Sequence, residues 1–292
     1  MRTFVKKLYR FIPLKKEFYT LLKTIWKPQE RIYKHLHFVG VIKVKVDEGS
    51  SFKIKHYGFQ IENEIFWAGL TNGWEKESMK LWIKLCKRSK TILDIGANTG
   101  VYSLVAKTIN PGAAVYAFEP VTRVFNKLKD NISLNDFDIV PIKKAVSNAD
   151  GVAVIYDTLT EHIYSVTVNK NLASSEVTVY EEEIETIKLD TFVSETGIQN
   201  IDLIKVDVET HEPEVLDGFL NNLFKFKPTF LIEILNNEVG KRVNTIMQKT
   251  DYLYFNIDEN GGLRQVEEIT QSDYYNYLLC SAEIAREIGF IK

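Results

Sequence analysis

The stretch from Thr91 to Gly100 reads Thr-Ile-Leu-Asp-Ile-Gly-Ala-Asn-Thr-Gly and joins an apolar run to a loop bounded by glycines. Residues 91–95 have the length and apolar content of a buried strand, and a helix is expected from Val101 to Ile109. Glycines at such a junction allow a sharp turn and let backbone N–H groups approach a ligand. The stretch therefore predicts a ligand-binding turn between a strand and a helix.

The spacing inside this loop narrows the class of ligand. A dinucleotide-binding fingerprint places a glycine where this chain has Asn98, so the loop disfavours a bridging pyrophosphate. Asp94 adds a carboxylate where a cationic group of a ligand can sit. The alternative is that the two glycines only make a tight turn. The cofactor-binding candidates from this stretch are Asp94, Gly96, Ala97, Asn98 and Gly100.

A second signal is Glu119-Pro120, which directly follows the next expected strand, Val115 to Phe118. A carboxylate at the end of a strand can accept hydrogen bonds from the two vicinal hydroxyls of a ribose. The proline ends the strand and restricts the backbone beside the carboxylate. In this order and spacing, the glycine loop and Glu119 together indicate a nucleoside ligand without a diphosphate bridge.

The third signal is the run Lys205-Val206-Asp207-Val208-Glu209-Thr210-His211-Glu212, at the end of another expected parallel strand. Ligands of doubly wound sheets bind outside the carboxyl ends of the strands, so this run points to the same crevice. His211 is either a general base or a surface histidine at a helix start. Glu212 either caps that helix or contacts a ligand. The catalytic candidates are Asp207, Glu209 and His211.

These motifs resemble the FkbM-like family of S-adenosylmethionine-dependent methyltransferases. The resemblance extends from Trp74 to Ile234 and rests on the runs 94–100, 117–120, 131–135, 205–209 and 215–218, together with Glu212. It implies a Rossmann-like class I methyltransferase fold and methyl transfer to hydroxyl oxygens, mostly of glycans and natural products. The family usually has glycine where this chain has Thr210, and the resemblance gives His211 no catalytic role.

The resemblance also implies how S-adenosylmethionine would lie. Asp94 and the loop backbone would hold the methionyl end and Glu119 the ribose, with adenine near Ala145 and Ser147. The protein would then hold the acceptor oxygen in line with the methyl carbon, while a carboxylate or histidine takes the hydroxyl proton. No metal site is assigned, although Asp207 and Glu209 could instead hold a divalent cation that orients the acceptor.

Two other functions share parts of this pattern. A nicotinamide-dependent oxidoreductase has the same order of strand, glycine loop and acidic residue, but it needs the glycine that Asn98 replaces. A non-catalytic relative would keep the donor pocket without turnover. The acceptor itself has no readable motif; residues 37–73 and 158–185 are the expected substrate-facing insertions, and the oligomeric state is likewise unreadable.

Alternating strands and helices predict an α/β fold with a doubly wound, mostly parallel sheet. The expected division is a basic helical extension over residues 1–36, a small β segment over 37–73 and a methyltransferase domain over 74–292. Alternating apolar residues predict two antiparallel strands at Val41–Val46 and Phe52–Lys55, and a third strand is expected from Phe59 to Trp67.

The first 36 residues differ from the rest in charge. They hold ten Lys or Arg against two Glu, a net charge of +8, so residues 37–292 carry about −10. The apolar residues Leu14, Phe18, Leu21, Leu22 and Ile25 fall on one face of a helix. The segment is therefore expected either to lie on an anionic membrane surface or to pack this apolar face on the protein.

The overall composition sets limits on the class of protein. The 292 residues are 45% hydrophobic and 26% charged with a net charge of −2, which suits a globular core and gives no field that attracts nucleic acid. Two cysteines, no expected signal peptide and no apolar run long enough to span a bilayer favour a cytoplasmic location. Peripheral contact at the inner membrane face is expected only if the basic segment lies on a membrane and does not pack on the protein.

Overall fold

The structure of this chain is a computed structural model that describes residues 14–73, 75–158, 166–167 and 179–291. Part of the expected N-terminal extension, residues 1–13, therefore lies outside the described residues, as does most of the insertion expected between residues 158 and 185. Within the described ranges, the protein has no helix that is both long enough and apolar enough to cross a bilayer.

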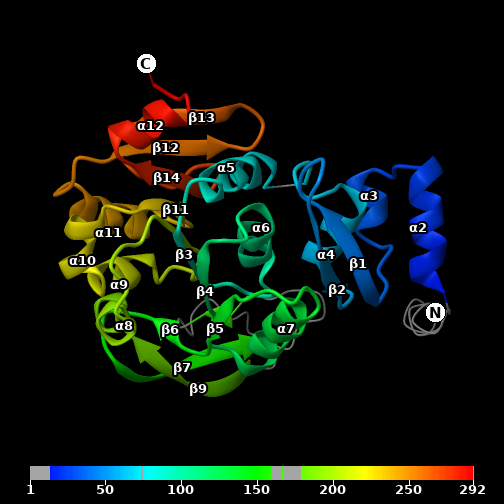
Figure 1. The fold of residues 1–292 in the computed structure, drawn as a ribbon, viewed down its shortest axis with the longest axis horizontal. Helices are drawn as coiled ribbons and strands as arrows, with labels where there is room; N and C mark the ends of the chain where they lie inside the picture. The colour runs from blue at the N-terminus through cyan, green and yellow to red at the C-terminus, as the bar shows by residue number, and fades with distance from the viewer. Residues whose placement is uncertain (1–13, 74, 159–165, 168–178, 292) are drawn as a thin grey trace.

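A mixed sheet of eight strands forms the centre of the protein (Figure 1). Its order is β13-β12-β14-β11-β10-β3-β4-β5, and the pairs that join β11, β10, β3, β4 and β5 are all parallel. β14 runs antiparallel to both of its neighbours, so β12 again points the same way as β11. The strands are β3 (Thr91–Ile95), β4 (Ala114–Phe118), β5 (Val140–Ile142), β10 (Leu203–Val206), β11 (Thr229–Glu233), β12 (Leu253–Asp258), β13 (Gly262–Val266) and β14 (Asn276–Cys280).

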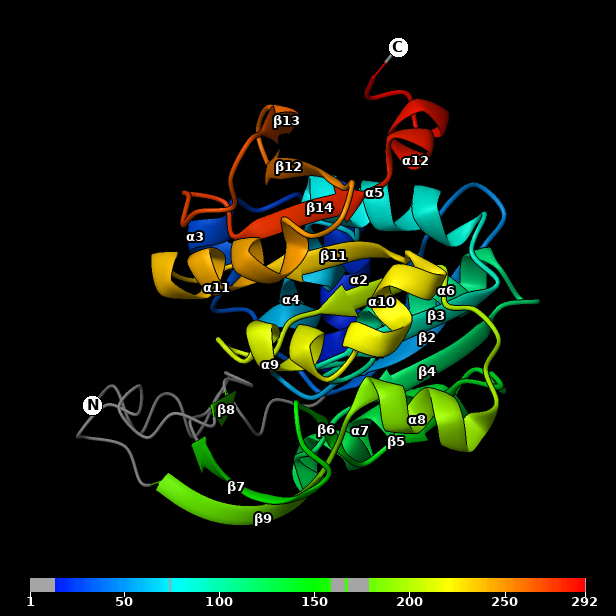
Figure 2. The same cartoon turned by 90° about the vertical axis from the view of Figure 1, so that its left-hand side faces the viewer.

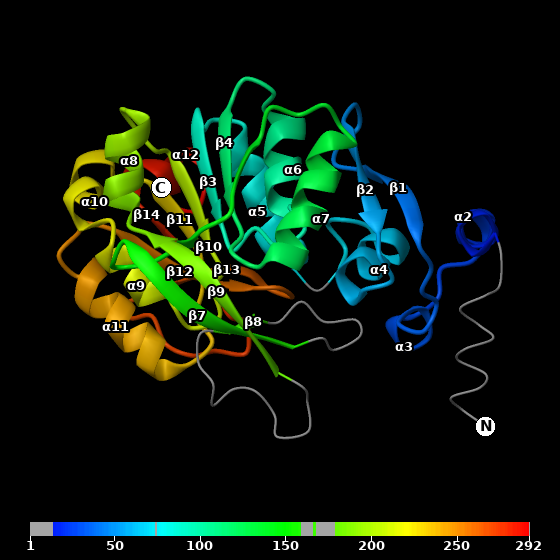
Figure 3. The same ribbon diagram turned by 90° about the horizontal axis from the view of Figure 1, so that it is seen from below.

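Helices cover both faces of this sheet, which confirms the expected doubly wound α/β architecture (Figure 3). Side chains alternate between the two faces along each strand, so Ile92 belongs to the hydrophobic cluster under one helical layer and Leu93 to the cluster under the other. The first layer holds α5 (Lys76–Cys86), α6 (Val101–Ile109), α7 (Thr122–Ser133) and α12 (Ala282–Glu287); the second holds α8 (Leu189–Thr196), α9 (Glu212–Asp217), α10 (Leu220–Phe226) and α11 (Asn237–Met247).

A second sheet is inserted between β5 and β10 and lies along one side of the main sheet (Figure 2). Its order is β6-β9-β7-β8, in which β7 and β9 form a long antiparallel pair. Its strands are β6 (Ala145–Val146), β7 (Gly151–Thr158), β8 (Val166–Thr167) and β9 (Val179–Ile187). Ile155 and Ile184 pack together between this sheet and the start of α7, so the insertion forms one wall beside the carboxyl end of β4.

The N-terminal part consists of α2 (Lys15–Ile25), α3 (Glu30–Tyr33), the antiparallel pair β1 (Gly40–Lys45) and β2 (Ser51–His56), and α4 (Gln60–Trp67). The expected pair of strands is thus present, but the third strand expected from Phe59 to Trp67 is wrong. This stretch is a helix because Glu62 and Phe66, four residues apart, are both buried on one side, and so are Asn63 and Trp67.

Asn131 of α7 and Asn135, just beyond the end of α7, join this N-terminal part to the main domain. Asn131 accepts a hydrogen bond from Lys55 N (2.9 Å) and donates one to Thr99 O (2.8 Å), while Asn135 bonds both backbone groups of Lys53. The side chains therefore act like a partner strand for the free edge of β2. The apolar residues of the N-terminal part also share one hydrophobic cluster with α5 and α6, so its core is continuous with that of the main domain.

Candidate active site

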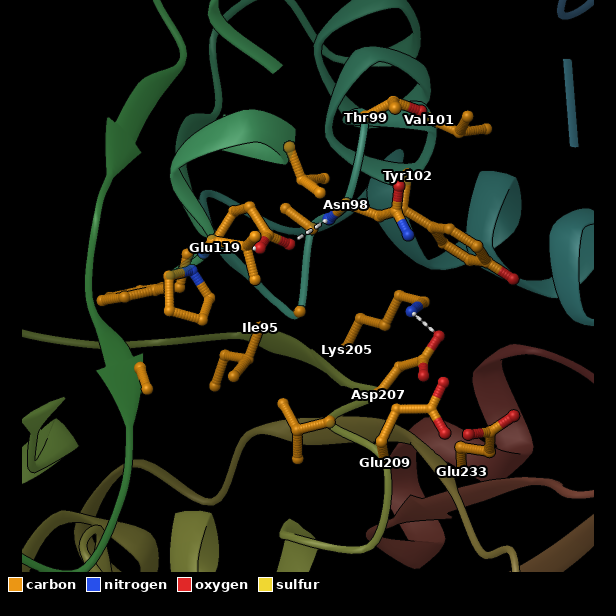
Figure 4. A pocket seen from close by; sticks show the side chains of 18 of the residues that line it. Ile95, Asn98, Thr99, Val101, Tyr102, Glu119, Lys205, Asp207, Glu209 and Glu233 are labelled. Atoms are coloured by element: carbon orange, nitrogen blue, oxygen red, sulfur yellow. Dashed lines mark hydrogen bonds and ion pairs between the residues drawn. The ribbon is translucent and has the colours of Figure 1, made fainter. Parts of the chain in front are cut away.

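A cavity of about 550 Å³ opens at the carboxyl ends of β3, β4, β10 and β11, the edge of the sheet where the three sequence signals meet (Figure 4). Nine of the twelve candidate residues line it, and Asp94, Gly100 and Ser147 do not. The nine are Gly96, Ala97, Asn98, Glu119, Pro120, Ala145, Asp207, Glu209 and His211. The fold thus brings residues from four separate parts of the chain to one site.

Glu119 lies at one end of the cavity with its carboxylate held by backbone groups. Its Oε1 accepts a hydrogen bond from Val121 N (2.9 Å) and its Oε2 accepts one from Asn98 N (3.1 Å). Each oxygen of a carboxylate can accept about two hydrogen bonds, so each retains an acceptor position. Burial raises the pKa of Glu119 to about 7, although its two backbone hydrogen bonds oppose this shift.

Asp94 is fully buried beneath the glycine loop and does not reach the cavity wall. The alternation along β3 turns its side chain to the face covered by α6, where its Oδ2 accepts a hydrogen bond from Ser103 Oγ (2.6 Å). Burial raises the pKa of Asp94, while the neighbouring Lys205 ammonium lowers it. Asp94 therefore bonds α6 behind the glycine loop and does not line the cavity, while its Oδ1 has no hydrogen-bond partner among the described residues.

Gly100 and Ser147 also act from behind the wall. Gly100 begins α6 with a φ of 91°, and a Cβ there would lie 2.6 Å from Leu128 Cδ1, so glycine lets the loop pack against α7. Ser147 Oγ lies 2.9 Å from His211 Nε2, and the other ring nitrogen of His211 lies 3.6 Å from Glu214 Oε2. Both nitrogens of His211 therefore face protein partners, and burial lowers its pKa.

The opposite end of the cavity contains a lysine surrounded by carboxylates. Lys205 is the register partner of Asp94 across β10 and β3, and its Nζ forms an ion pair with Asp207 Oδ2 at 2.7 Å. Burial alone lowers the pKa of Lys205, but the carboxylates of Asp207, Asp94 and Glu75 outweigh burial and raise it above the usual value. The ammonium also lies 4.6 Å from the ring centroid of Tyr102. A buried positive charge thus fixes Asp207.

Glu75 and Glu233 belong to this end of the cavity, and sequence reasoning missed both. Glu75 accepts hydrogen bonds from the Tyr102 hydroxyl (2.9 Å) and from Asn276 Nδ2 (3.1 Å). Glu233 ends β11, beside Asp207 and Glu209 (Figure 4), and burial together with these two carboxylates raises its pKa to about 10. The position of Glu233 at the carboxyl end of a parallel strand was the signal that could have identified it.

The loop that carries Glu209 has an uncommon backbone. Glu209 and Thr210 both have positive φ, 55° and 81°, in the region that glycine occupies most easily. The buried Glu212 stabilises this turn, because its Oε1 accepts hydrogen bonds from Val208 N (3.1 Å) and Thr210 N (3.3 Å). Glu212 does not line the cavity, and burial raises its pKa to about 8. Glu212 therefore neither caps α9, as the sequence allowed, nor lines the cavity; it holds the turn before the helix.

The N-terminal part supplies another wall of the same cavity through Glu30 of α3 and through Gln60, Ile61 and Glu64 of α4. Ile155 and Ile184 from the inserted sheet line the same cavity. Both segments expected to face the substrate therefore border the site. Within the described residues, no group of three or more His, Cys, Asp and Glu side chains is arranged to hold a metal ion.

Residues 94–255, more than half of the chain, match the family described as the methyltransferase FkbM domain. The chain belongs to the FkbM methyltransferase family. The matched residues include the glycine loop, Glu119 and the 205–212 run, so the family assignment and the cavity concern the same part of the protein. The assignment confirms the expected class of fold and the expected cofactor of the family, S-adenosylmethionine.

This FkbM chain is similar to several curated relatives. The hexuronic acid methyltransferase AglP of Haloferax volcanii is 28% identical over 149 residues, which cover 51% of this chain and 58% of AglP. The 2-O-methyltransferase NoeI of Sinorhizobium fredii is 31% identical over 152 residues, which cover 48% of this chain and 61% of NoeI. The 31-O-demethyl-FK506 methyltransferase FkbM of Streptomyces tacrolimicus is 30% identical over 151 residues, covering 44% of this chain and 58% of the relative. The chain thus spans less than two thirds of each relative's length.

Proposed function

We propose that this chain transfers a methyl group from S-adenosylmethionine to a hydroxyl oxygen of a sugar, glycan or glycolipid-type acceptor. The observation that carries the proposal is one cavity with a ribose-binding type of carboxylate, Glu119, at one end and a charged pair, Lys205–Asp207, at the other. The relatives add support, since one is named for a hexuronic acid and two are named for transfer at an oxygen.

The donor end fits a nucleoside. The two acceptor positions left on the Glu119 carboxylate match the two hydroxyls of a ribose. Ala145 and Val146 provide the apolar surface on which an adenine ring would lie. The backbone of the loop at Gly96 and Ala97 would hold the methionyl end, and Asn98 Oδ1, which is buried and has no hydrogen-bond partner among the described residues, can accept a hydrogen bond from its ammonium group.

The acidic end is suited to proton transfer from an acceptor hydroxyl. When bound, S-adenosylmethionine supplies an electrophilic methyl carbon. Asp207, held by Lys205, or Glu209 would take the proton that the hydroxyl loses as its oxygen attacks this carbon. Glu233, with its raised pKa, stays protonated at neutral pH and can donate a hydrogen bond to the acceptor. Three neighbouring carboxyl groups can thus fill different roles.

The structure makes His211 a weaker candidate for the general base than the sequence alone does. Its two ring nitrogens face Ser147 and Glu214, so a proton taken from the acceptor would displace one of these contacts. We assign His211 to shaping the wall near β6, and we assign the chemistry to Asp207 or Glu209.

Binding and turnover separate this proposal from its two alternatives. S-adenosylmethionine should raise the melting temperature of the purified full chain, whereas NAD should not, because a ligand stabilises only the state that binds it. The converse result would favour the nicotinamide oxidoreductase. Stabilisation by S-adenosylmethionine without transfer to any acceptor would favour the non-catalytic relative.

Transfer can be followed with a methyl-labelled donor and a panel of hexuronic acids, neutral hexosides and lipid-linked glycans. We expect label in a sugar fraction that survives mild alkali, because a methyl ether at a hydroxyl is stable there and a methyl ester at a carboxylate is not. Alkali-labile label would overturn the assignment to hydroxyl oxygen. The folded double variant Asp207→Asn, Glu209→Gln, which lacks both candidate bases, serves as the control for non-enzymatic transfer.

A further inference from the structure

An exposed row of apolar side chains runs along α2. Leu14, Phe18, Leu21 and Ile25 follow one another at helical spacing, and they are 72%, 59%, 69% and 83% exposed. We call these four residues the α2 stripe. The sequence left open whether the apolar face of this helix packs on the protein. The structure turns these four residues to the solvent, whereas Leu22 packs on the hydrophobic core. In the described part of the chain, nothing covers the stripe.

The opposite face of α2 holds the helix in this orientation. Tyr19 is buried, and its ring packs against the rings of Phe38 and Trp67. Lys23 Nζ donates a hydrogen bond to the backbone oxygen of Phe66 in α4. Because Tyr19 and Lys23 are four residues apart, they fix the inner face of the helix, and the α2 stripe must point away from the protein.

The charge around the α2 stripe is positive. Lys27, Arg31 and Lys34 follow it and are exposed, and residues 1–36 together carry a net charge of +8. Trp26, at the end of the helix, is 40% exposed. Exposed apolar residues next to basic residues and a tryptophan are the composition of a helix that lies in the interface of an anionic membrane.

We propose that α2 binds the surface of an anionic lipid bilayer, with the α2 stripe inserted among the acyl chains and the basic residues at the level of the headgroups. Pairing with a second copy through the stripe is less favourable, because it would bring two segments of charge +8 together. Anionic lipid neutralises the same charge. Among the other exposed apolar residues of the described chain, Val152 and Val154 share β7 and Phe224 is on α10, so none of these elements has a matching row of four.

Membrane binding at α2 would bring the cavity close to the bilayer. Glu30 lines the cavity and is only five positions after Ile25 of the stripe. In addition, α4 binds Lys23 of α2 through the Phe66 backbone, and the same helix contributes Gln60 to the cavity wall. Resting on the proposed function, this placement favours an acceptor anchored in the membrane, such as a lipid-linked glycan, over a free sugar.

Flotation of the full chain with vesicles tests the binding itself. The chain should float with vesicles that contain phosphatidylglycerol and not with phosphatidylcholine alone, and binding should weaken as salt rises. Phe18→Ser combined with Leu21→Ser should lower the partition coefficient by about tenfold or more, because it removes two apolar side chains from the acyl region. The matched control, Val152→Ser combined with Phe224→Ser, should bind like the unaltered chain.

A second pair of variants tests how much the basic residues beside the α2 stripe contribute to membrane binding. Lys27→Gln with Arg31→Gln should lower binding by about tenfold at low salt, whereas Lys90→Gln with Lys249→Gln, also exposed bases, should not. Upon binding, Trp26 fluorescence should shift to shorter wavelength, and the shift should vanish in Trp26→Phe. Affinity for S-adenosylmethionine without vesicles should be unchanged in all these variants, which keeps this test separate from that of the donor site.

Two results would overturn the proposal. One is equal flotation of the α2 stripe variant and its matched control. The other is a dimer of the full chain in solution that becomes a monomer in the stripe variant, since a second copy would then cover the stripe. Light scattering coupled to size-exclusion chromatography distinguishes these states.

Discussion

Gly96 and Asp207 meet through their backbones: a Cβ placed on Gly96 would lie 1.8 Å from the carbonyl oxygen of Asp207. The first loop of the sheet and the end of β10 therefore touch without a side chain between them. This contact brings the donor loop next to the residues of the acidic end, so the two halves of the cavity depend on one glycine.

Gly96→Ala should destabilise the protein by about 2–4 kcal/mol, because a side chain at φ 78° is strained and its Cβ would displace the Asp207 backbone. Donor affinity should fall with it. Gly197→Ala is a matched control, since Gly197 has a similar φ of 67° with no atom within 4 Å of the added Cβ. Chemical denaturation measures the free energy of unfolding of both variants. An equal loss of stability in the two would show that the contact with Asp207 is unimportant.

Glu119→Gln should weaken S-adenosylmethionine binding by about tenfold or more, since it removes a charge-assisted acceptor of ribose hydroxyls. The pKa of about 7 adds a pH dependence. Below pH 7 the free carboxyl is protonated and must lose its proton to bind as the carboxylate, so affinity should fall by up to about tenfold per pH unit. Calorimetry should show this slope in the unaltered chain and not in Glu119→Gln; parallel profiles would remove Glu119 from the ribose site.

Asp207→Asn and Glu209→Gln keep the shape of each side chain and remove its charge. The variant that lacks the base should lose about 10²- to 10⁴-fold in turnover while donor affinity changes little. Glu238→Gln, on the exposed surface of α11, provides the control. Unaltered rates in both site variants would place the chemistry elsewhere in the cavity.

Glu233→Gln should stabilise the protein at pH 8 by about 1–3 kcal/mol and have little effect near pH 4. The pKa of Glu233 is raised from 4.5 to about 10, so the folded protein holds a proton that the unfolded chain releases above pH 4.5. The carboxyl group therefore costs stability as pH rises from 4.5 toward 10, and glutamine avoids that cost. Thermal unfolding across this range measures the difference, and a gain that is independent of pH would contradict the assignment.

Thr210→Gly should increase the free energy of unfolding by about 1 kcal/mol. Thr210 has a β-branched side chain at φ 81°, where glycine is unstrained. As a control, Thr196→Gly in α8 should lower the free energy of unfolding, because glycine weakens a helix. If Thr210→Gly destabilises the protein, contacts of the threonine side chain outweigh the backbone strain.

Much of the fold could be predicted from local pattern. The strand at 91–95, the helix at 101–109 and the order of glycine loop, Glu119 and Asp207 depend on short-range periodicity and on residues that end strands. The stretch 59–67 shows the limit of this approach. Its apolar residues fit a strand as well as a helix, and packing of Phe66 and Trp67 against the N-terminal core selected the helix.

The candidate site, like the fold, was predictable from the sequence only in part. The sequence by itself determined which residue types stand at the carboxyl ends of the strands, because strand ends and the residues that follow them are local features. Tertiary structure decided that Asp94 faces α6 and not the cavity, that Glu233 joins Asp207, and that the α2 stripe faces solvent. Periodicity shows which side chains share a face, but only packing between distant segments decides what each face contacts.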